Sequence, residues 1–146
     1  MDQNQIELGQ SKESIENILG NPIASEENQS SDSDVRKIWW NVDYQNVKIT
    51  YREDSYGQRE AISFIIESPR IQVYSGIEVG NKVDPLLEKL SNKNNVVIYE
   101  FGSPTNVYSL VFNESAYSVA SASPVLTFYC TEDKRIHKIV VSDTSF

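Results

Sequence analysis

The chain has 146 residues with 21 acidic and 13 basic side chains, which give a net charge of −8, and it contains one cysteine. This acidic balance argues against binding to nucleic acids or to an anionic membrane surface, because both present phosphate groups that need basic side chains. A single cysteine excludes an internal disulfide and a metal cluster built from cysteines.

A sequence motif occurs twice, first over Ile6–Pro22 and again over Ile77–Asn92. Aligned without a gap, the two copies share five identities: Ile6/Ile77, Glu7/Glu78, Gly9/Gly80, Leu19/Leu90 and Asn21/Asn92. Each copy predicts a short extended lead-in, a turn at Gly9 or Gly80 and a short helix, since glycine adopts positive φ without strain. Ser11 is the expected N-cap of the first helix. Helices this short are marginal alone, so each must pack on strands.

The residues after the first helix predict a loop followed by three strands. Residues 25–34 are polar, acidic and without period, which is typical of a surface loop. Apolar and polar residues then alternate over residues 35–42, 46–53 and 59–68, and this alternation predicts strands that are buried on one face. The short turns between them favour an antiparallel meander.

Four further strands are predicted over residues 95–101, 107–113, 125–131 and 135–142, with an irregular insertion over 114–124. If the last two strands follow the register of the earlier ones, their outer face carries mostly apolar side chains, namely Leu126, Phe128, Cys130, Ile136 and Val140. Such a face is too apolar for open solvent. Either it meets a partner or a second copy, or the faces are inverted there by a shift of one residue in register.

These elements together predict an α+β fold made of two tandem repeats, residues 1–74 and residues 75–146. Each repeat is expected to pack a short helix on a three- to four-stranded antiparallel meander. We expect the two sheets to join into one curved sheet.

The motif Ile-x-Leu-Gly-x-Ser-x-Glu-x-Ile-x-x-Ile-Leu-Gly-x-Pro, which begins at Ile6, carries a family resemblance. Followed by a strand meander and repeated once, it resembles the SmpA/OmlA and β-lactamase-inhibitor-protein (BLIP) group. The resemblance implies two helix-plus-sheet units joined edge to edge, with a concave sheet face that binds a protein. It also implies a protein that is secreted or held in the cell envelope.

The location of the protein rests on that resemblance. The sequence opens Met1-Asp2-Gln3-Asn4-Gln5, which shows no signal-peptide pattern. This opening fits an exported protein whose leader is missing, and it fits a cytoplasmic protein equally well. No apolar run reaches the ~20 residues of a membrane-spanning helix.

Residues that could carry catalysis are sparse, and we predict no catalytic site, no cofactor and no metal site. His137 is the only histidine, and no serine or cysteine pattern accompanies it. Cys130 sits between strand residues, where a small buried side chain is the usual role. The acidic run Asp32-Ser33-Asp34 lacks the spaced ligands and the glycine of a calcium-binding loop.

Aromatic and charged residues at strand faces and turns are the better functional signal, because Trp, Tyr and Arg are enriched at binding hot spots. Trp39 is expected on the outer side of its strand, while Trp40 faces the core. The candidate partner-binding residues are Lys37, Trp39, Arg52, Asp54, Tyr56 and Phe128. The alternative for Trp39 is that it covers a sheet edge or packs on the other repeat.

The sequence therefore predicts a non-catalytic module that binds a protein partner, such as a secreted or envelope enzyme, through its sheet face. The alternative is a structural role without inhibition, as an envelope lipoprotein ectodomain or as a homodimer closed through the sheet face of the second repeat. A small hydrolase that uses carboxylates is a third and more remote hypothesis.

Overall fold

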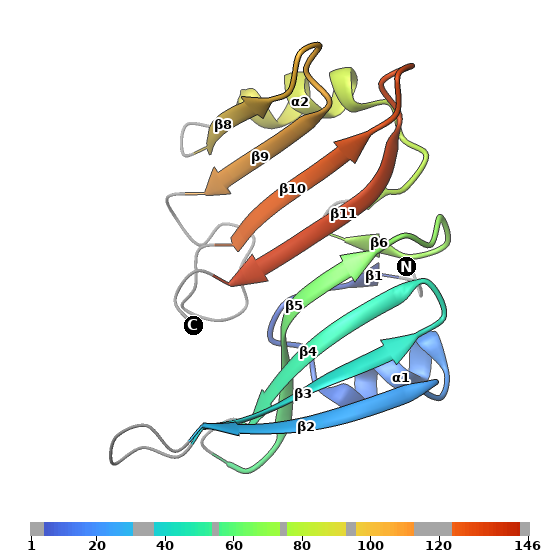
Figure 1. The fold of residues 1–146 in the computed structure, drawn as a ribbon, viewed down its shortest axis with the longest axis vertical. Coiled ribbons are helices and arrows are strands. Elements are labelled where there is room, and N and C mark those ends of the chain that lie inside the picture. Colours follow the sequence, from blue (N-terminus) through green and yellow to red (C-terminus); the bar gives the residue numbers. More distant parts are fainter. Residues whose placement is uncertain are drawn as a thin grey trace.

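A computed structural model describes residues 5–30, 37–53, 56–73, 76–92, 96–112 and 124–143. Most described residues belong to strands, and eight of these form one antiparallel sheet in the order β2-β3-β4-β5-β11-β10-β9-β8 (Figure 1). The strands are β2 (Ala24–Ser30), β3 (Lys37–Tyr44), β4 (Val47–Glu53), β5 (Arg59–Ile66), β8 (Val96–Phe101), β9 (Val107–Phe112), β10 (Pro124–Cys130) and β11 (Ile136–Asp143). Three two-residue strands, β1 (Gln5–Ile6), β6 (Gln72–Val73) and β7 (Ile77–Glu78), form a second, small sheet.

The two halves of the large sheet are joined at its middle by a pair of strands that lie far apart in the sequence. Strand β5 lies beside β11, with Ile66 opposite Ile139 and Phe64 opposite Val141. All four of these side chains are buried. Strands that follow α1 and strands that follow α2 are therefore joined by one ladder of main-chain hydrogen bonds, and the buried side chains form one continuous cluster.

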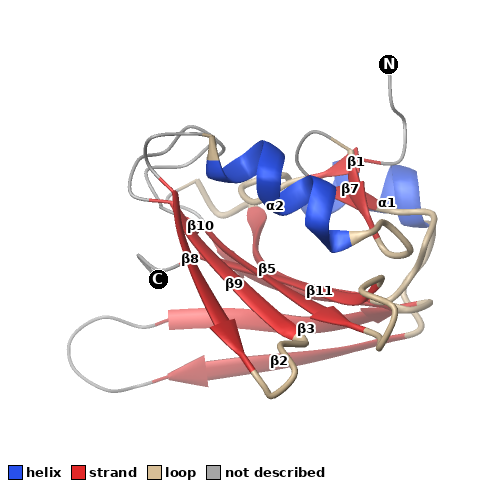
Figure 2. Ribbon diagram, turned by 90° about the horizontal axis from the view of Figure 1, so that it is seen from above, coloured by secondary structure: helices blue, strands red, loops and turns tan. Residues whose placement is uncertain are grey.

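Two short helices, α1 (Lys12–Leu19) and α2 (Val83–Ser91), cover the same face of the large sheet (Figure 2). Alternation along the strands produces this buried face: in β4, Val47, Ile49 and Tyr51 are buried, while the residues between them are not. No helix among the described residues is long and apolar enough to cross a membrane.

The glycine turns predicted ahead of both helices are confirmed. Gly9 has φ 86° and Gly80 has φ 101°. The Gly9 N–H donates to the carbonyl of Ala61 in β5 over 2.8 Å, and the Gly80 N–H donates to the carbonyl of Ile136 in β11 over 2.7 Å. Each turn thus fastens its helix to one of the two central strands. Ser11 is the N-cap of α1, as predicted, and its Oγ accepts from the Ser14 N–H over 3.1 Å.

The prediction of two tandem repeats, each a helix on its own meander, was wrong. The protein is mostly β, with one eight-stranded antiparallel sheet and two helices. The helices add little to the core: α1 fully buries only Ile15, and α2 buries only Val83 and Leu90. Most of the buried apolar side chains come from strands, so the pairing of strands determines the architecture.

The prediction of a loop over residues 25–34 was wrong for residues 25–30, because Ala24–Ser30 forms β2. This strand lies at the edge of the sheet, and most of its side chains are exposed. A strand in that position needs no apolar period, so its polar sequence indicated a loop. Residues 31–34 lie outside the described residues, as does the predicted insertion over 114–124 except for Pro124, which begins β10.

Candidate protein-binding face

The face of the large sheet opposite α1 and α2, named the open face here, is the candidate binding surface. No described helix covers it (Figure 2). Strand register places its side chains in rows that cross the sheet. One row, from β2 to β8, contains Glu26, Asn41, Thr50, Ser63, Ser142, Val125, Val111 and Val97.

The half of the open face formed by β2 to β5 is polar and internally ordered. Trp39 lies opposite Arg52, and Arg52 lies opposite Glu60. Arg52 Nε donates to Glu60 Oε1 over 2.9 Å, which forms an ion pair. In the next row, Thr50 Oγ1 donates to Asn41 Oδ1 over 3.0 Å. These contacts hold the polar side chains in defined positions before any partner arrives.

A shallow depression of about 210 Å³ lies within this polar half. It is lined by Asn41, Val42, Asp43, Lys48, Ile49, Thr50, Ser63 and Ile65. Its volume is below the ~300 Å³ at which pockets for small molecules begin. The depression therefore suits a single side chain of a protein partner better than a free ligand.

The half of the open face formed by β8 to β11 is apolar. On β8, Val97 is 40% exposed, Tyr99 is 52% exposed and Phe101 is 54% exposed. Tyr99 lies opposite Ser109 of β9, and Phe101 lies opposite Val107. Contiguous exposed apolar side chains of this kind mark interaction surfaces.

The apolar half continues to Tyr129 of β10, whose ring is held by two neighbours from β11. Lys138 Nζ lies 4.3 Å from the centroid of the ring, and the imidazole centroid of His137 lies 6.5 Å from it. His137 is exposed and is placed as a neighbour of an aromatic side chain. The aromatic surface thus extends from the edge strand towards the middle of the sheet.

The structure brings together some of the residues predicted from the sequence and separates others. Trp39 and Arg52 lie side by side on the open face, as expected, and Trp40 faces the core. Tyr56 is 89% exposed in the turn between β4 and β5. Asp54 and the side chain of Lys37 lie outside the described residues.

The choice of Phe128 as a partner contact was wrong, because this side chain is 0% exposed and belongs to the core. Leu126, Cys130 and Ile136 are buried with it. The second of the two explanations therefore holds for β10 and for Ile136, whose faces were inverted in the sequence interpretation. Val140 lies on the open face, as expected, opposite Thr127 and Ile65. The true surface residues of β10 are its odd-numbered ones, such as Tyr129.

Sequence reasoning missed Val97, Tyr99 and Phe101. The signal was present in the run Val96-Val97-Ile98-Tyr99-Glu100-Phe101, in which every residue except Glu100 is apolar or aromatic. Such a run gives little polar contrast between its two faces, so one apolar set must be exposed if one face of the sheet is left without a covering layer.

A partly buried hydrogen-bond network lies on the opposite, helix-covered side. The Tyr44 hydroxyl donates to Glu16 Oε2 over 2.7 Å and lies 2.8 Å from the Tyr51 hydroxyl, while Lys12 Nζ donates to the same Glu16 oxygen over 2.7 Å. Burial opposes ionisation of Glu16, but hydrogen bonds from Lys12 and Tyr44 outweigh it and lower the pKa of its carboxyl. Burial also raises the pKa of both tyrosines. The network has no free member to act on a substrate, and it fastens α1 to the sheet.

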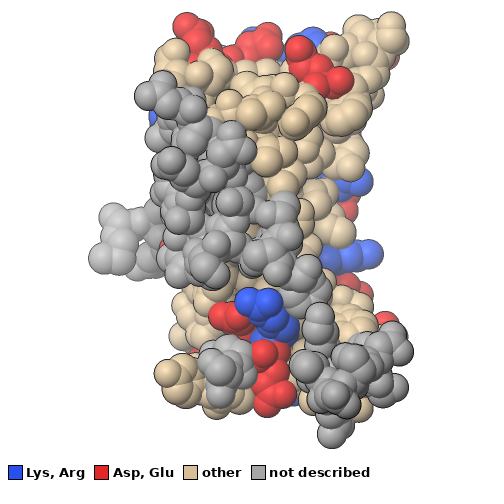
Figure 3. Space-filling model, turned by 90° about the vertical axis from the view of Figure 1, so that its left-hand side faces the viewer, with Lys and Arg blue, Asp and Glu red and all other residues tan. Residues whose placement is uncertain are grey.

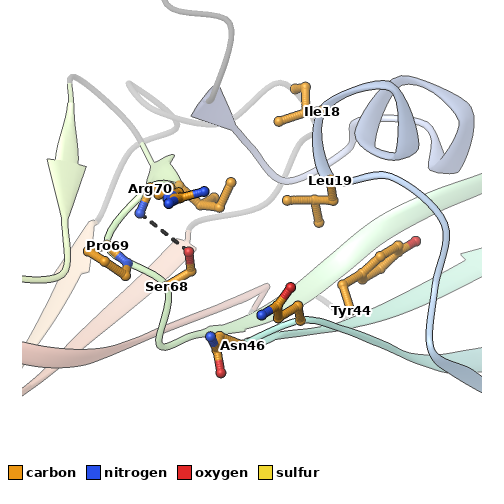
Figure 4. A pocket seen from close by; sticks show the side chains of 9 residues that line it. Ile18, Leu19, Tyr44, Asn46, Ser68, Pro69 and Arg70 are labelled. Atoms are coloured by element: carbon orange, nitrogen blue, oxygen red, sulfur yellow. Dashed lines mark hydrogen bonds between the residues drawn. The ribbon is translucent and has the colours of Figure 1, made fainter.

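A pocket of about 580 Å³ lies between the end of α1, the β3–β4 turn and the segment after β5 (Figure 4). Its lining is Ile18, Leu19, Tyr44, Gln45, Asn46, Ser68, Pro69, Arg70 and Ile71. Arg70 is the only charged member of this lining, and its backbone N–H donates to Ser68 Oγ over 3.3 Å. This lining offers no general acid and base pair, so its geometry gives no support to acid–base catalysis.

In the described part of the chain, no three His, Cys, Asp or Glu side chains gather as a metal site would require. Comparisons with protein-family models, with curated proteins and with solved structures gave no match for this chain. The resemblance to the BLIP group, and the secreted or envelope location that it implies, therefore stay predictions.

Proposed function

We propose that the protein is a non-catalytic module that binds a protein partner through the open face of its large sheet. The observation that carries the proposal is a sheet face that no described helix covers, with a fixed polar half around Trp39 and Arg52 and an apolar half around Tyr99 and Phe101. Specific interfaces combine a desolvated apolar core with a polar rim that fixes orientation. Aromatic and Arg side chains supply most of the binding energy at such interfaces.

The net charge of the chain indicates which kind of partner surface it would favour. The chain carries a net charge of −8. A partner surface with an excess of Lys and Arg would be drawn to it at a higher association rate, and this advantage would fall as salt is added. The partner expected is therefore a folded protein with a basic rim around an apolar patch.

The experiment is affinity capture from the secreted and envelope fractions of the source organism, using three immobilised baits. The first bait is the wild-type chain, and the second is W39A/Y99A, which removes one aromatic side chain from each half of the open face. The third is N17A/E88A, which alters exposed residues of α1 and α2 on the opposite side. The captured protein is then purified and titrated against each bait.

A partner bound by the wild type and by N17A/E88A, but bound at least ~30-fold more weakly by W39A/Y99A, would support the open face as the site. Equal affinity for all three baits would place the site elsewhere. Turnover of a small substrate by the purified chain would overturn the non-catalytic part of the proposal.

A further inference from the structure

The two edges of the large sheet differ in chemistry. Edge strand β2 carries Glu26 and Glu27, both exposed, and acidic side chains at an edge discourage pairing with another strand. Edge strand β8 has no proline, no lysine and one acid, Glu100. Its register with β9 runs without a bulge from Val96 to Phe101. Strand β8 therefore lacks the devices by which edge strands usually avoid other chains.

The outer edge of β8 is free among the described residues. Strand β8 pairs with β9 alone, so alternate N–H and C=O groups along its other side have no strand partner. Figure 3 views the side of the molecule on which β8 lies in Figure 1. The described surface in the upper part of that view is mostly uncharged, with charged side chains along its top, whereas basic and acidic side chains lie close together across its lower part.

We propose that β8 pairs antiparallel with β8 of a second copy of this chain, so that the two large sheets become one. A twofold axis perpendicular to the sheet creates this contact and keeps the helices of both copies on the same side. The free main-chain groups of β8 would then be satisfied by hydrogen bonds between the copies, as in other cases of strand addition.

The register of β8 is self-complementary, and this favours a second copy over an unrelated strand. In paired strands, residues opposite each other point to the same face of the sheet, so one residue of β8 must lie opposite its own copy at the twofold axis. Placing the axis at Ile98 or at Tyr99 pairs the largest number of β8 residues. An axis at Ile98 sets Val97 against Tyr99 of the second copy. An axis at Tyr99 sets Val97 against Phe101 of the second copy. Both give aromatic–β-branched cross-strand pairs, which stabilise antiparallel strands.

Charge is compatible with the same arrangement. With the axis at Ile98, Glu100 lies opposite Val96 of the second copy, and with the axis at Tyr99 it lies opposite Ile98. Neither register sets one Glu100 directly against the other, although the chain as a whole is strongly acidic. An analogous contact at β2 would gather four exposed glutamates, since each copy contributes Glu26 and Glu27. The pairing is therefore restricted to one edge, which gives a closed dimer in place of a fibre.

The test measures the mass of the full chain by sedimentation velocity from about 1 μM to about 1 mM. The variant V97K/Y99K places like charges directly opposite each other in both registers, because lysines meet at 97 and 99 in one and at 99 and 99 in the other. N17K/Q45K adds the same two charges at exposed positions away from β8. T127K adds a lysine to the middle of the open face and reports on stacking through that face, which edge pairing would not need.

We expect the measured mass of the wild type, N17K/Q45K and T127K to rise with concentration from 16.6 kDa towards twice that value. We expect V97K/Y99K to associate at least ~10-fold more weakly. Hydrogen exchange of wild type gives a check that needs no variant: the amides of residues 96–101 should gain protection as concentration rises. A wild type that stays at 16.6 kDa throughout would overturn the inference, as would association that T127K abolishes and V97K/Y99K does not. The inference does not rest on the proposed partner binding, because it concerns the pure chain alone.

Discussion

The hydroxyl of Tyr44 on β3 donates a hydrogen bond to the carboxylate of Glu16 on α1 across 2.7 Å. Tyr44 also shares a 2.8 Å hydrogen bond with Tyr51 on β4, and both tyrosines are buried. The helix is thus joined to the sheet by a chain of hydrogen bonds that runs from the partly exposed Glu16 into the apolar core. Buried polar groups that all have partners rigidify the structure, and the loss of one member leaves the others unsatisfied.

Replacing Tyr44 with phenylalanine should therefore lower the free energy of unfolding by about 1–3 kcal/mol, because the buried Tyr51 hydroxyl loses its partner. The measurement is urea denaturation followed by tryptophan fluorescence. Tyr99→Phe removes an exposed hydroxyl and is the matched control, for which no change is expected. A Y44F variant as stable as the wild type would show that the network contributes nothing.

The Glu16 carboxylate should make the stability of the protein sensitive to acid. Its pKa is lowered in the folded protein from the ordinary value of 4.5, so the folded state binds its proton less readily than the unfolded state does. Its stabilising contribution is present above pH 4.5 and is lost as the pH falls through the lower folded-state pKa. In denaturation series at successive pH values, E16Q should lose less stability on acidification than the wild type.

The variant Y44F gives an internal check on that pH profile. It keeps the Glu16 carboxylate and the Lys12 hydrogen bond but removes one donor. Its acid sensitivity should lie between those of E16Q and the wild type. Identical profiles for all three proteins would contradict the assignment of the effect to Glu16.

Truncation of two adjacent residues of β10 should reduce stability by very different amounts. Phe128 is fully buried, so Phe128→Ala should cost about 3–5 kcal/mol of stability through lost burial and the cavity left behind. Tyr129 lies on the open face, so Tyr129→Ala should cost less than about 1 kcal/mol. Thermal and urea denaturation of both variants measure the difference. Equal costs would mean that the two faces of β10 are not distinguished as described.

Trp39 and Trp40 offer the same comparison on β3, now with a binding readout. Trp39→Ala should weaken binding of the captured partner by about 2 kcal/mol or more while the fold is retained. Trp40 is buried, its Nε1 donates to Glu27 Oε1, and the Arg59 guanidinium lies 3.8 Å from its ring centroid. Trp40→Ala should therefore reduce stability first. Calorimetric titration and denaturation of both variants separate the two effects, and full partner affinity in W39A would remove Trp39 from the site.

Local chemistry made part of this structure predictable from sequence. Gly9 and Gly80 indicated turns because few other residues take positive φ, and the alternation around Trp40 identified the buried face of β3. Alternation could not decide the faces of β10, since Leu126 and Phe128 on one side are matched by Val125 and Tyr129 on the other. Both sets are apolar enough for a core, and only the packing of the whole sheet separates them.

Other features lie beyond any local pattern. The edge position of β2 removes the need for an apolar face, so its polar residues carried no strand signal. The exposure of Tyr99 depends on both helices lying on the other face of the sheet, which no local pattern determines. Of the candidate site, the pair formed by Trp39 and Arg52 was within reach of sequence reasoning, and the apolar half was not.

The pairing of β5 with β11 also has a consequence for biosynthesis. Ile66 and Ile139 face each other at the centre of the sheet although 72 residues separate them along the chain. Strand β11 is the last strand described, so while the ribosome is still making it, β5 and β10 each have one unpaired side. The growing chain therefore carries the unpaired edge of β5 for about half of its synthesis, and the edge of β10 only briefly before β11 is made. The long wait of β5 is a period in which chaperones would have the most to protect. Removing β11 by truncation would make that transient condition permanent.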